Sequence, residues 1–397
     1  MKRGHILIIS TYLIILGLLI ANFKIHNTSI SNIIPLIIFP VLLLFLFPRR
    51  YILDKLQVNI LLVIIVLSFL FSISFVFWVS EPNFNFSTFK NTLLIFYFYI
   101  LFLSFLGIFL KSYTPSQIVL SSIKRFIYFL LQINSIFILI QLLLFKIFNY
   151  EVVFPWYGPS SIWPIFRPSG LFSEPSHFAE FFLLYLIMFD IEFGLKDLIV
   201  ILGLAISTSL LGFFSIFLYI ALFLVRGRKR SKIKLSFLIS LLIIILIGTF
   251  FNQYFFTRLS LLYSDNSFKL RFLKFFYVGR FLDFRRLLIG FGFGNSGLAM
   301  EYYHGPYEFL FNQLPSYFSG IGNNVLMAGL LTSIILELFI VFIFTKVKGK
   351  FWGTFLYFVF LVIRLIADIN FTMLYFWLVL YILVIEYYTN SIPKGRE

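Results

Sequence analysis

The sequence predicts an all-α integral membrane protein, a polytopic bundle of about twelve transmembrane helices with two larger extracytoplasmic loops. Hydrophobic residues make up 61% of the 397 residues, and charged residues only 12%. The mean hydropathy is +1.00. A soluble domain has roughly a quarter of its residues charged, whereas here long stretches are nearly free of charge. We therefore treat residues 1–397 as a single polytopic membrane domain.

Each expected span holds roughly 17 to 25 predominantly apolar residues, enough to cross the hydrocarbon core as a helix. The first span follows Met1-Lys2-Arg3, as a signal peptide would, but no small-residue cleavage site comes after it. We keep it as a helix. The hydropathy evidence is weakest for the pair at 197–225. The expected spans are residues 6–23, 30–47, 57–79, 90–110, 126–148, 177–193, 197–209, 211–225, 235–251, 323–345, 351–367 and 371–388.

Lys and Arg residues alternate between the loops in a way that predicts the orientation. Cytoplasmic loops carry an excess of these residues, and every second loop here, starting at the N-terminus, has at least one. This predicts an even number of spans with the N- and C-termini in the cytoplasm. Two substantial loops then lie outside, at 149–176 and 252–322. The inner positive charges include Arg49, Arg50, Lys111, Lys124, Arg125, Lys196, Arg226, Arg228, Lys346, Lys348 and Lys350.

Charge and composition also exclude several classes of protein. The net charge of +16 could indicate a nucleic-acid partner, but in a membrane protein it first reflects cytoplasmic anchoring. The chain has no cysteine, so disulfides and thiolate metal sites are excluded. Its four histidines are scattered without metal-ligand spacing. We expect no metal, no cofactor and no nucleic acid.

Scarce polar residues gather in "IFRPSGLFSEPSHFAEFF", at the end of the first outer loop. Pro168 to Gly170 predicts a type I turn with Arg167 at its first position. Glu174 and Pro175 are typical of a helix start. The positive end of that helix dipole faces outward, where it attracts anions.

Three ionisable residues follow at i, i+3 and i+6 in the same stretch. Glu174, His177 and Glu180 therefore share an arc of about 120° on the new helix. One interpretation is an interfacial belt that anchors a helix end at the headgroups. The other is a functional site, favoured because Glu180 lies a turn inside the hydrocarbon boundary, where acids are expensive.

"RPSGLFSEPSHFAEF" resembles the signature of the Wzy-type O-antigen and capsular polysaccharide polymerases, in the superfamily that includes the O-antigen ligases. Three later stretches also resemble that family, and the likeness covers roughly 156–337. They are "ISTSLLGFF" (206–214), "FRRLLIGFGFGN" (284–295) and "GIGNNVLMAGLLTSIILE" (320–337). The matching positions in the first stretch are Arg167, Gly170, Glu174, Pro175 and Ala179.

The second outer loop is rich in Lys and Arg, whose guanidinium forks suit phosphate oxygens. Arg258, Arg271 and Arg280 are the candidates for ligand contact. The stretch 267–281 also fits an amphipathic helix on the membrane surface. Lys269, Lys274, Arg285 and Arg286 fit that surface role equally well.

The resemblance implies a membrane glycosyltransferase that polymerises undecaprenyl-pyrophosphate-linked glycan repeat units at the outer face of the bacterial cytoplasmic (inner) membrane. For this reaction we assign Arg167, Arg258, Arg271 and Arg280 to the pyrophosphate. Glu174 becomes the base or a structural cap, and His177 a secondary base. Gly170 and Glu180 would help to bind the substrate. Partners would be the lipid-linked glycans, membrane lipid, a chain-length regulator and a flippase.

Two other functions remain open. An O-antigen ligase would be expected to carry a His-Asn pair before the helix at 323–345, but "SGIGNN" has no histidine. A transporter of lipid-linked sugars tends to place its charges near the midplane, often with internal repeats. Among the intramembrane charges, Arg364 and Asp368 are spaced i, i+4 and are expected to pair. Glu337 is expected to have a structural partner.

Overall fold

A computed structural model gives the fold of the protein. The chain divides into two compact units, the first made of Met1–Ile9, Pro35–Leu120 and Tyr263–Glu397 and the second of Ser10–Ile34 and Ser121–Leu262. The structure describes residues 2–19, 24–25, 28–29, 37–38, 53–113, 116–148, 168–172, 174–189, 197–207, 209–226 and 269–391.

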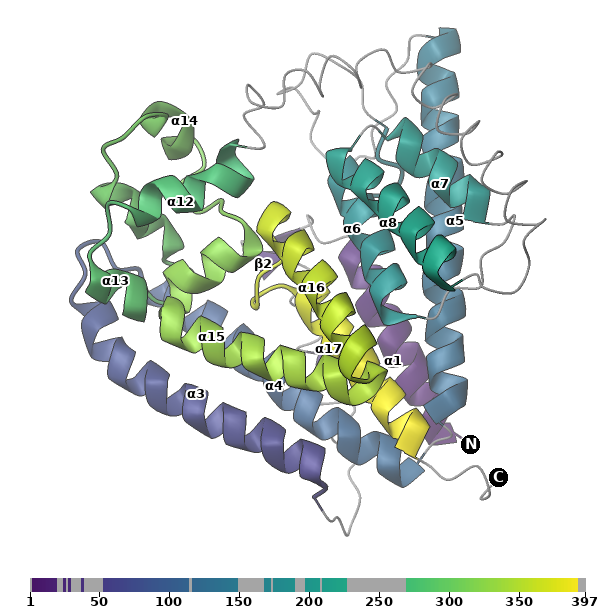
Figure 1. Ribbon diagram of the computed structural model, residues 1–397, viewed down its shortest axis with the longest axis horizontal. Coiled ribbons are helices and arrows are strands. Elements are labelled where there is room, and N and C mark those ends of the chain that lie inside the picture. The colour runs from purple at the N-terminus through teal and green to yellow at the C-terminus, as the bar shows by residue number, and fades with distance from the viewer. Residues whose placement is uncertain are drawn as a thin grey trace. The chain divides into compact units, whose positions relative to one another are not determined.

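The first unit is a group of long helices with a small lobe of short ones (Figure 1). In it α15 packs against α3, α16 and α17, and α4 packs against α3 and α17. The long helices are α3 (Lys55–Val79), α4 (Phe86–Tyr113), α15 (Gly320–Lys348), α16 (Lys350–Ile366) and α17 (Leu374–Ser391).

The second unit is also mainly helical. It contains α6 (Pro175–Met188), α7 (Asp197–Ile206) and α8 (Leu210–Arg226), and α6 packs against both of the others. A two-residue antiparallel ladder, β1 (Lys24–Ile25) with β2 (Thr28–Ser29), is a small departure from the all-α prediction. Two helices, α1 (Lys2–Leu19) and α5 (Ser116–Phe148), contribute residues to both units.

The described helices make this a helical membrane protein. Four of them, α3, α4, α5 and α15, are long and apolar enough to cross a membrane. Helices occupy most of the described residues of the expected spans, although some residues at their ends, such as 207, 209 and 371–373, are not helical. Residues 235–251 and nearly all of 30–47 lie outside the described residues. At 1.5 Å per residue, the 14 residues of α6 and the 10 of α7 are shorter than a hydrocarbon core of about 30 Å. Twelve complete spans are thus a prediction that the structure leaves open.

Helix α3 begins two residues earlier than predicted, because a capping box fixes its first turn. The Asp54 carboxylate accepts a hydrogen bond from the Gln57 amide, and the Gln57 side chain accepts one from the Asp54 amide, each 3.0 Å long. Two free N–H groups are satisfied in this way. The Tyr388 hydroxyl donates to the same Asp54 carboxylate at 2.6 Å and so ties α17 to the start of α3.

Much of the second expected outer loop is a folded lobe, residues 269–318, rather than a plain connection. Its elements surround a hydrophobic cluster that includes Phe291, Tyr303, Phe311 and Phe318. The elements are η1 (Lys269–Leu273), α12 (Lys274–Gly279), α13 (Phe284–Ile289), η2 (Ser296–Tyr302) and α14 (Glu308–Asn312).

Candidate functional site

The turn before α6 lies two positions later than predicted. The amide of Phe172 donates to the carbonyl of Ser169 at 3.3 Å, so the turn runs from Ser169 to Phe172. Gly170 occupies its second position with φ of +67°. Turns with a positive φ there belong to the primed types, in which glycine is favoured, rather than to type I. Arg167 lies outside the described residues.

Two buried polar side chains of α5 hold this turn. Gln141 accepts a hydrogen bond from the Gly170 amide at 2.8 Å, and Asn134 accepts one from the Leu171 amide at 2.6 Å. They are seven residues apart and so project from one side of α5. A β-carbon on Gly170 would collide with the Asn134 side chain. The glycine is therefore required both for its backbone angle and for close packing.

The carboxylate of Glu174 is not a helix cap. Glu174 stands at the N-cap position of α6 in an extended conformation, but its side chain makes no capping hydrogen bond. It accepts instead from the Ser176 hydroxyl at 3.0 Å, and it is exposed. Pro175 begins the helix without an N–H to satisfy. The structure therefore does not support the role of a structural cap for Glu174, and its role as a base stays a prediction.

The other two ionisable residues of α6 differ in burial. His177 is half-buried, whereas Glu180 is only 5% exposed. Both interact with other groups of the protein. Gly170, Glu174, His177 and Glu180 thus all belong to the second unit, on the turn and the first two turns of α6.

A buried carboxylate that the sequence analysis did not single out lies in the same unit. Asp197, the first residue of α7, accepts from the Tyr128 hydroxyl at 2.5 Å and from the Tyr219 hydroxyl at 2.6 Å. It thereby joins α5, α7 and α8. Asp197 is the first residue of the expected span 197–209, but the sequence alone indicated no partner for its carboxylate.

The predicted phosphate-binding arginines fall in different places. Arg280 belongs to the first unit, on the surface of the lobe, with its guanidinium 5.9 Å from the Tyr277 ring centroid. The backbone of Arg271 lies in η1. Arg258 lies outside the described residues.

The Gly-rich stretch of the lobe pairs with an interruption in α15. At Gly329 φ is 84° and ψ is 162°, so the helix breaks there. Near the break, the Leu326 carbonyl accepts from the Phe291 amide at 2.7 Å, and the Met327 carbonyl accepts from the Gly292 amide at 2.9 Å. Within a membrane protein such broken backbone is tolerated only where its polar groups are satisfied.

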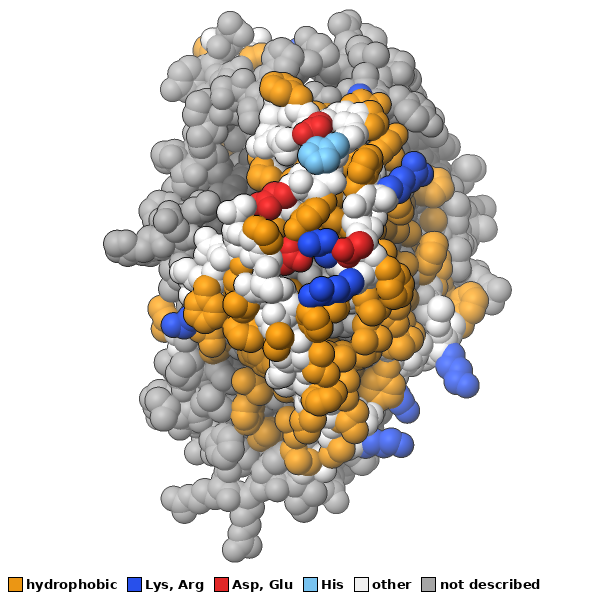
Figure 2. Space-filling model, turned by 90° about the vertical axis from the view of Figure 1, so that its left-hand side faces the viewer, with side chains coloured by type: hydrophobic (Ala, Val, Ile, Leu, Met, Phe, Trp, Pro, Cys, Tyr) orange, Lys and Arg blue, Asp and Glu red, His pale blue; other side chains and the backbone are white. Residues whose placement is uncertain are grey.

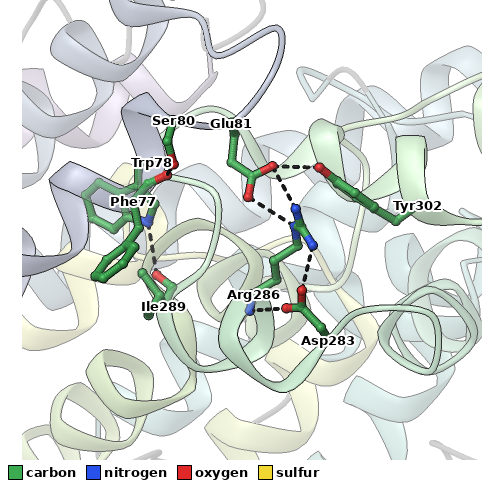
Figure 3. A network of polar contacts seen from close by, with 8 residues as sticks. All are labelled: Phe77, Trp78, Ser80, Glu81, Asp283, Arg286, Ile289 and Tyr302. Atoms are coloured by element: carbon green, nitrogen blue, oxygen red, sulfur yellow. Dashed lines mark hydrogen bonds and ion pairs between the residues drawn. The ribbon is translucent and has the colours of Figure 1, made fainter.

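A polar network connects the end of α3 to the lobe (Figure 3). Arg286 forms ion pairs with Glu81 at 3.0 Å and with Asp283 at 2.6 Å. The Tyr302 hydroxyl donates to Glu81 at 2.6 Å, and the Trp78 indole donates to the Ile289 carbonyl at 3.0 Å. Arg286 is therefore mainly a structural residue, which differs from the free surface role that the sequence suggested.

Lys274 is buried instead of lying on a membrane-facing surface. Its ammonium donates to the carbonyls of Phe311, Leu314 and Pro315 at distances from 2.6 to 3.1 Å. It lies 4.4 Å from the Phe318 ring centroid. Burial lowers the pKa of Lys274 to about 7, while three carbonyl acceptors favour the charged form. Lys274 holds the end of α14 and the turn after it.

The predicted pairing of Arg364 with Asp368 is wrong. Arg364 is fully buried and forms an ion pair of 2.6 Å with Glu337 of α15. Glu337 thus has the structural partner that was expected. Asp368 accepts instead from the side-chain amides of Asn323 and Asn370, at 3.0 and 2.9 Å.

In the described part of the chain, no three His, Cys, Asp or Glu side chains are placed to hold a metal ion. No family model, no curated protein and no solved structure matches the chain.

Proposed function

We propose that the protein is a membrane glycosyltransferase that joins lipid-linked glycan repeat units at the outer face of the bacterial cytoplasmic membrane. The observation that supports it most is the pairing of two stretches that resemble the polymerase family. Residues 284–295 and 320–337 are separate in the sequence, yet Phe291 and Gly292 bind the broken turn of α15. Substrate sites in membrane proteins often use such broken helices.

In the proposed reaction, the terminal hydroxyl of one lipid-linked repeat unit attacks the anomeric carbon of a second, growing glycan. A new glycosidic C–O bond forms, and the C–O bond to the diphosphate breaks. The lipid diphosphate leaves with the electron pair of that bond. The proton of the attacking hydroxyl passes to a base on the protein.

Glu174 is the proposed base, because its exposed carboxylate makes no capping bond and lies at the start of α6. His177, one turn further on, is the secondary base. The N-terminus of α6 and the side chains of Arg167 and Arg258, which belong to the same unit, would stabilise the charge that grows on the diphosphate. Gly170 shapes the turn beside Glu174, and Glu180 would contact the sugar.

The experiment is complementation of a bacterial strain that lacks its repeat-unit polymerase. Cells carrying the wild-type chain should make a ladder of long glycans. Glu174→Ala and Arg167→Ala, at equal protein levels, should leave single-repeat glycan. Glu308→Ala, which removes an exposed acid of the lobe, is the control and should keep the ladder.

Three results would contradict the proposal. Long glycan made by both site variants would remove Glu174 and Arg167 from the mechanism. Full-length polymer that stays on its carrier lipid in cells without the protein would indicate a ligase. Single-repeat units confined to the cytoplasmic face would indicate a transporter.

A further inference from the structure

One side of α3 carries a continuous row of apolar side chains that no other described part of the protein covers. The spacing of three and four residues places them in a line along the helix. The row is Leu62, Ile65, Phe69, Ile73, Val76 and Val79, each about half exposed or more. From Leu62 to Val79 it extends for about 25 Å, most of the hydrocarbon thickness. Acyl chains are what such a row contacts in a bilayer.

A cation stands at the C-terminal end of this row. The Arg285 guanidinium lies 4.3 Å from the ring centroid of Phe77, near the end of α3. Arg285 is exposed, and its neighbour Phe284 is 75% exposed. A flat guanidinium on an aromatic face keeps its edge and its N–H donors available.

The two carboxylates in this region form ion pairs with Arg286 and not with Arg285. Glu81 and Asp283 both pair with Arg286, and Glu81 also accepts from Tyr302. Arg285 has no ion pair with any residue that the structure describes. Figure 2 shows this side of the molecule, where charged side chains gather above a broad hydrophobic surface. Such a boundary is typical of the level of lipid phosphates.

We propose that Arg285 and the row on α3 form a binding site for one anionic phospholipid. The phosphate would bind the guanidinium, because its fork matches two phosphate oxygens. One acyl chain would lie along the half of the row nearest to Arg285, from Val79 to Phe69, because one leaflet is about half of the hydrocarbon thickness. This site is independent of the glycosyltransferase reaction.

Native mass spectrometry of the purified full-length protein tests the site. The protein is reconstituted with equal parts of phosphatidylglycerol and phosphatidylcholine, and the retained lipids are counted. Wild type should keep one phosphatidylglycerol at low concentration. Arg285→Gln should weaken its retention about fivefold, the factor that corresponds to ~1 kcal/mol for one cation at a membrane surface. Phe77→Leu should weaken it less, because the cation remains.

The matched control is Lys350→Gln. Lys350 is also an exposed cation at a helix start beside an exposed phenylalanine, Phe351. The Lys350→Gln substitution should lower phosphatidylglycerol retention less than Arg285→Gln does. Equal losses in the two variants would mean general surface charge and would overturn the site. Displacement of the retained lipid by added farnesyl diphosphate would overturn the choice of a phospholipid, because the position would then prefer an isoprenoid diphosphate.

Discussion

A β-carbon on Gly290 would lie 2.7 Å from the backbone nitrogen of Gly329. The two glycines let the lobe backbone touch the interruption in α15 directly. Hydrogen bonds from the Phe291 and Gly292 amides follow from that approach. The proposed function and the integrity of α15 both depend on this contact.

Substitution of Gly329 should therefore lower the stability of the fold far more than substitution of a glycine with the same backbone angles elsewhere. Gly329 and Gly349 have φ of 84° and 83°, but a β-carbon meets the Leu288 carbonyl at the first and nothing within 4 Å at the second. Both alanine variants carry strain of about 1–3 kcal/mol. Gly329→Ala should add another 1–3 kcal/mol or so of crowding. Thermal unfolding in detergent compares them, and equal melting temperatures would refute the close contact.

The ion pair between Glu81 and Arg286 should be coupled energetically. Both side chains are largely buried, and removal of one leaves the other without its main partner. In a double-mutant cycle with Glu81→Gln and Arg286→Gln, we expect a coupling of about 1–3 kcal/mol. Unfolding of the four proteins in denaturant measures it. Arg285→Gln, which breaks no ion pair, should be additive with Glu81→Gln, and coupling there as large as in the Arg286 cycle would contradict the network.

Tyr302 should make stability fall at alkaline pH. Burial, together with the hydrogen bond to Glu81, raises the pKa of Tyr302 above its ordinary value of 10.0. A hydroxyl with a higher pKa in the folded chain contributes stability that is fully present below pH 10 and lost as pH rises through the folded value. Melting temperatures between pH 8 and 11 should thus fall less steeply in Tyr302→Phe than in wild type. Parallel curves would show that the Tyr302 hydroxyl is not involved.

Lys274→Met should loosen the lobe. The substitution leaves three carbonyl groups without their donor, at a cost of about 3 kcal/mol. Limited proteolysis should then cut near Leu314 and Pro315 much faster than in wild type. Lys269→Met is the control, since the Lys269 ammonium lies 4.7 Å from the Tyr307 ring centroid and holds no backbone in this way. Equal cleavage in both variants would argue against the role of Lys274.

The absence of cysteine makes the predicted orientation simple to test. His304→Cys places a single thiol on the exposed part of the lobe, and Lys350→Cys places one beyond the end of α15. A membrane-impermeant maleimide should label the first in intact cells and the second only after permeabilisation. The reverse pattern would place the lobe in the cytoplasm and rule out the proposed site of reaction.

Apolar composition was sufficient to predict the long helices, because burial in lipid demands long stretches without charge, but it did not predict the short helices of the lobe. The break at Gly329 could not be predicted in this way. A single glycine in "VLMAGLLTS" is tolerated in a helix, and the groups that stabilise the break come from residues 291 and 292, far upstream.

The candidate site was predicted less completely, because several of its contacts join residues that are far apart in the sequence. Glu174, His177 and Glu180 were found because they cluster locally in a polar stretch. Arg364 was assigned a partner by the local i, i+4 rule, but Glu337 on another helix is the actual one. Lys274 was predicted to lie on the surface because it is charged. Its burial could not be predicted, because its carbonyl partners lie about 40 residues downstream.

The pairing of residues 291 and 292 with α15 also has a consequence for how the protein is made. The lobe leaves the ribosome before α15 does, so its donors already exist when the helix enters the bilayer. Until they dock, the carbonyls of Leu326 and Met327 have no partner in lipid. We therefore expect α15 to reach its final shape only after the lobe has folded, which makes membrane insertion and folding of this region a single coupled event.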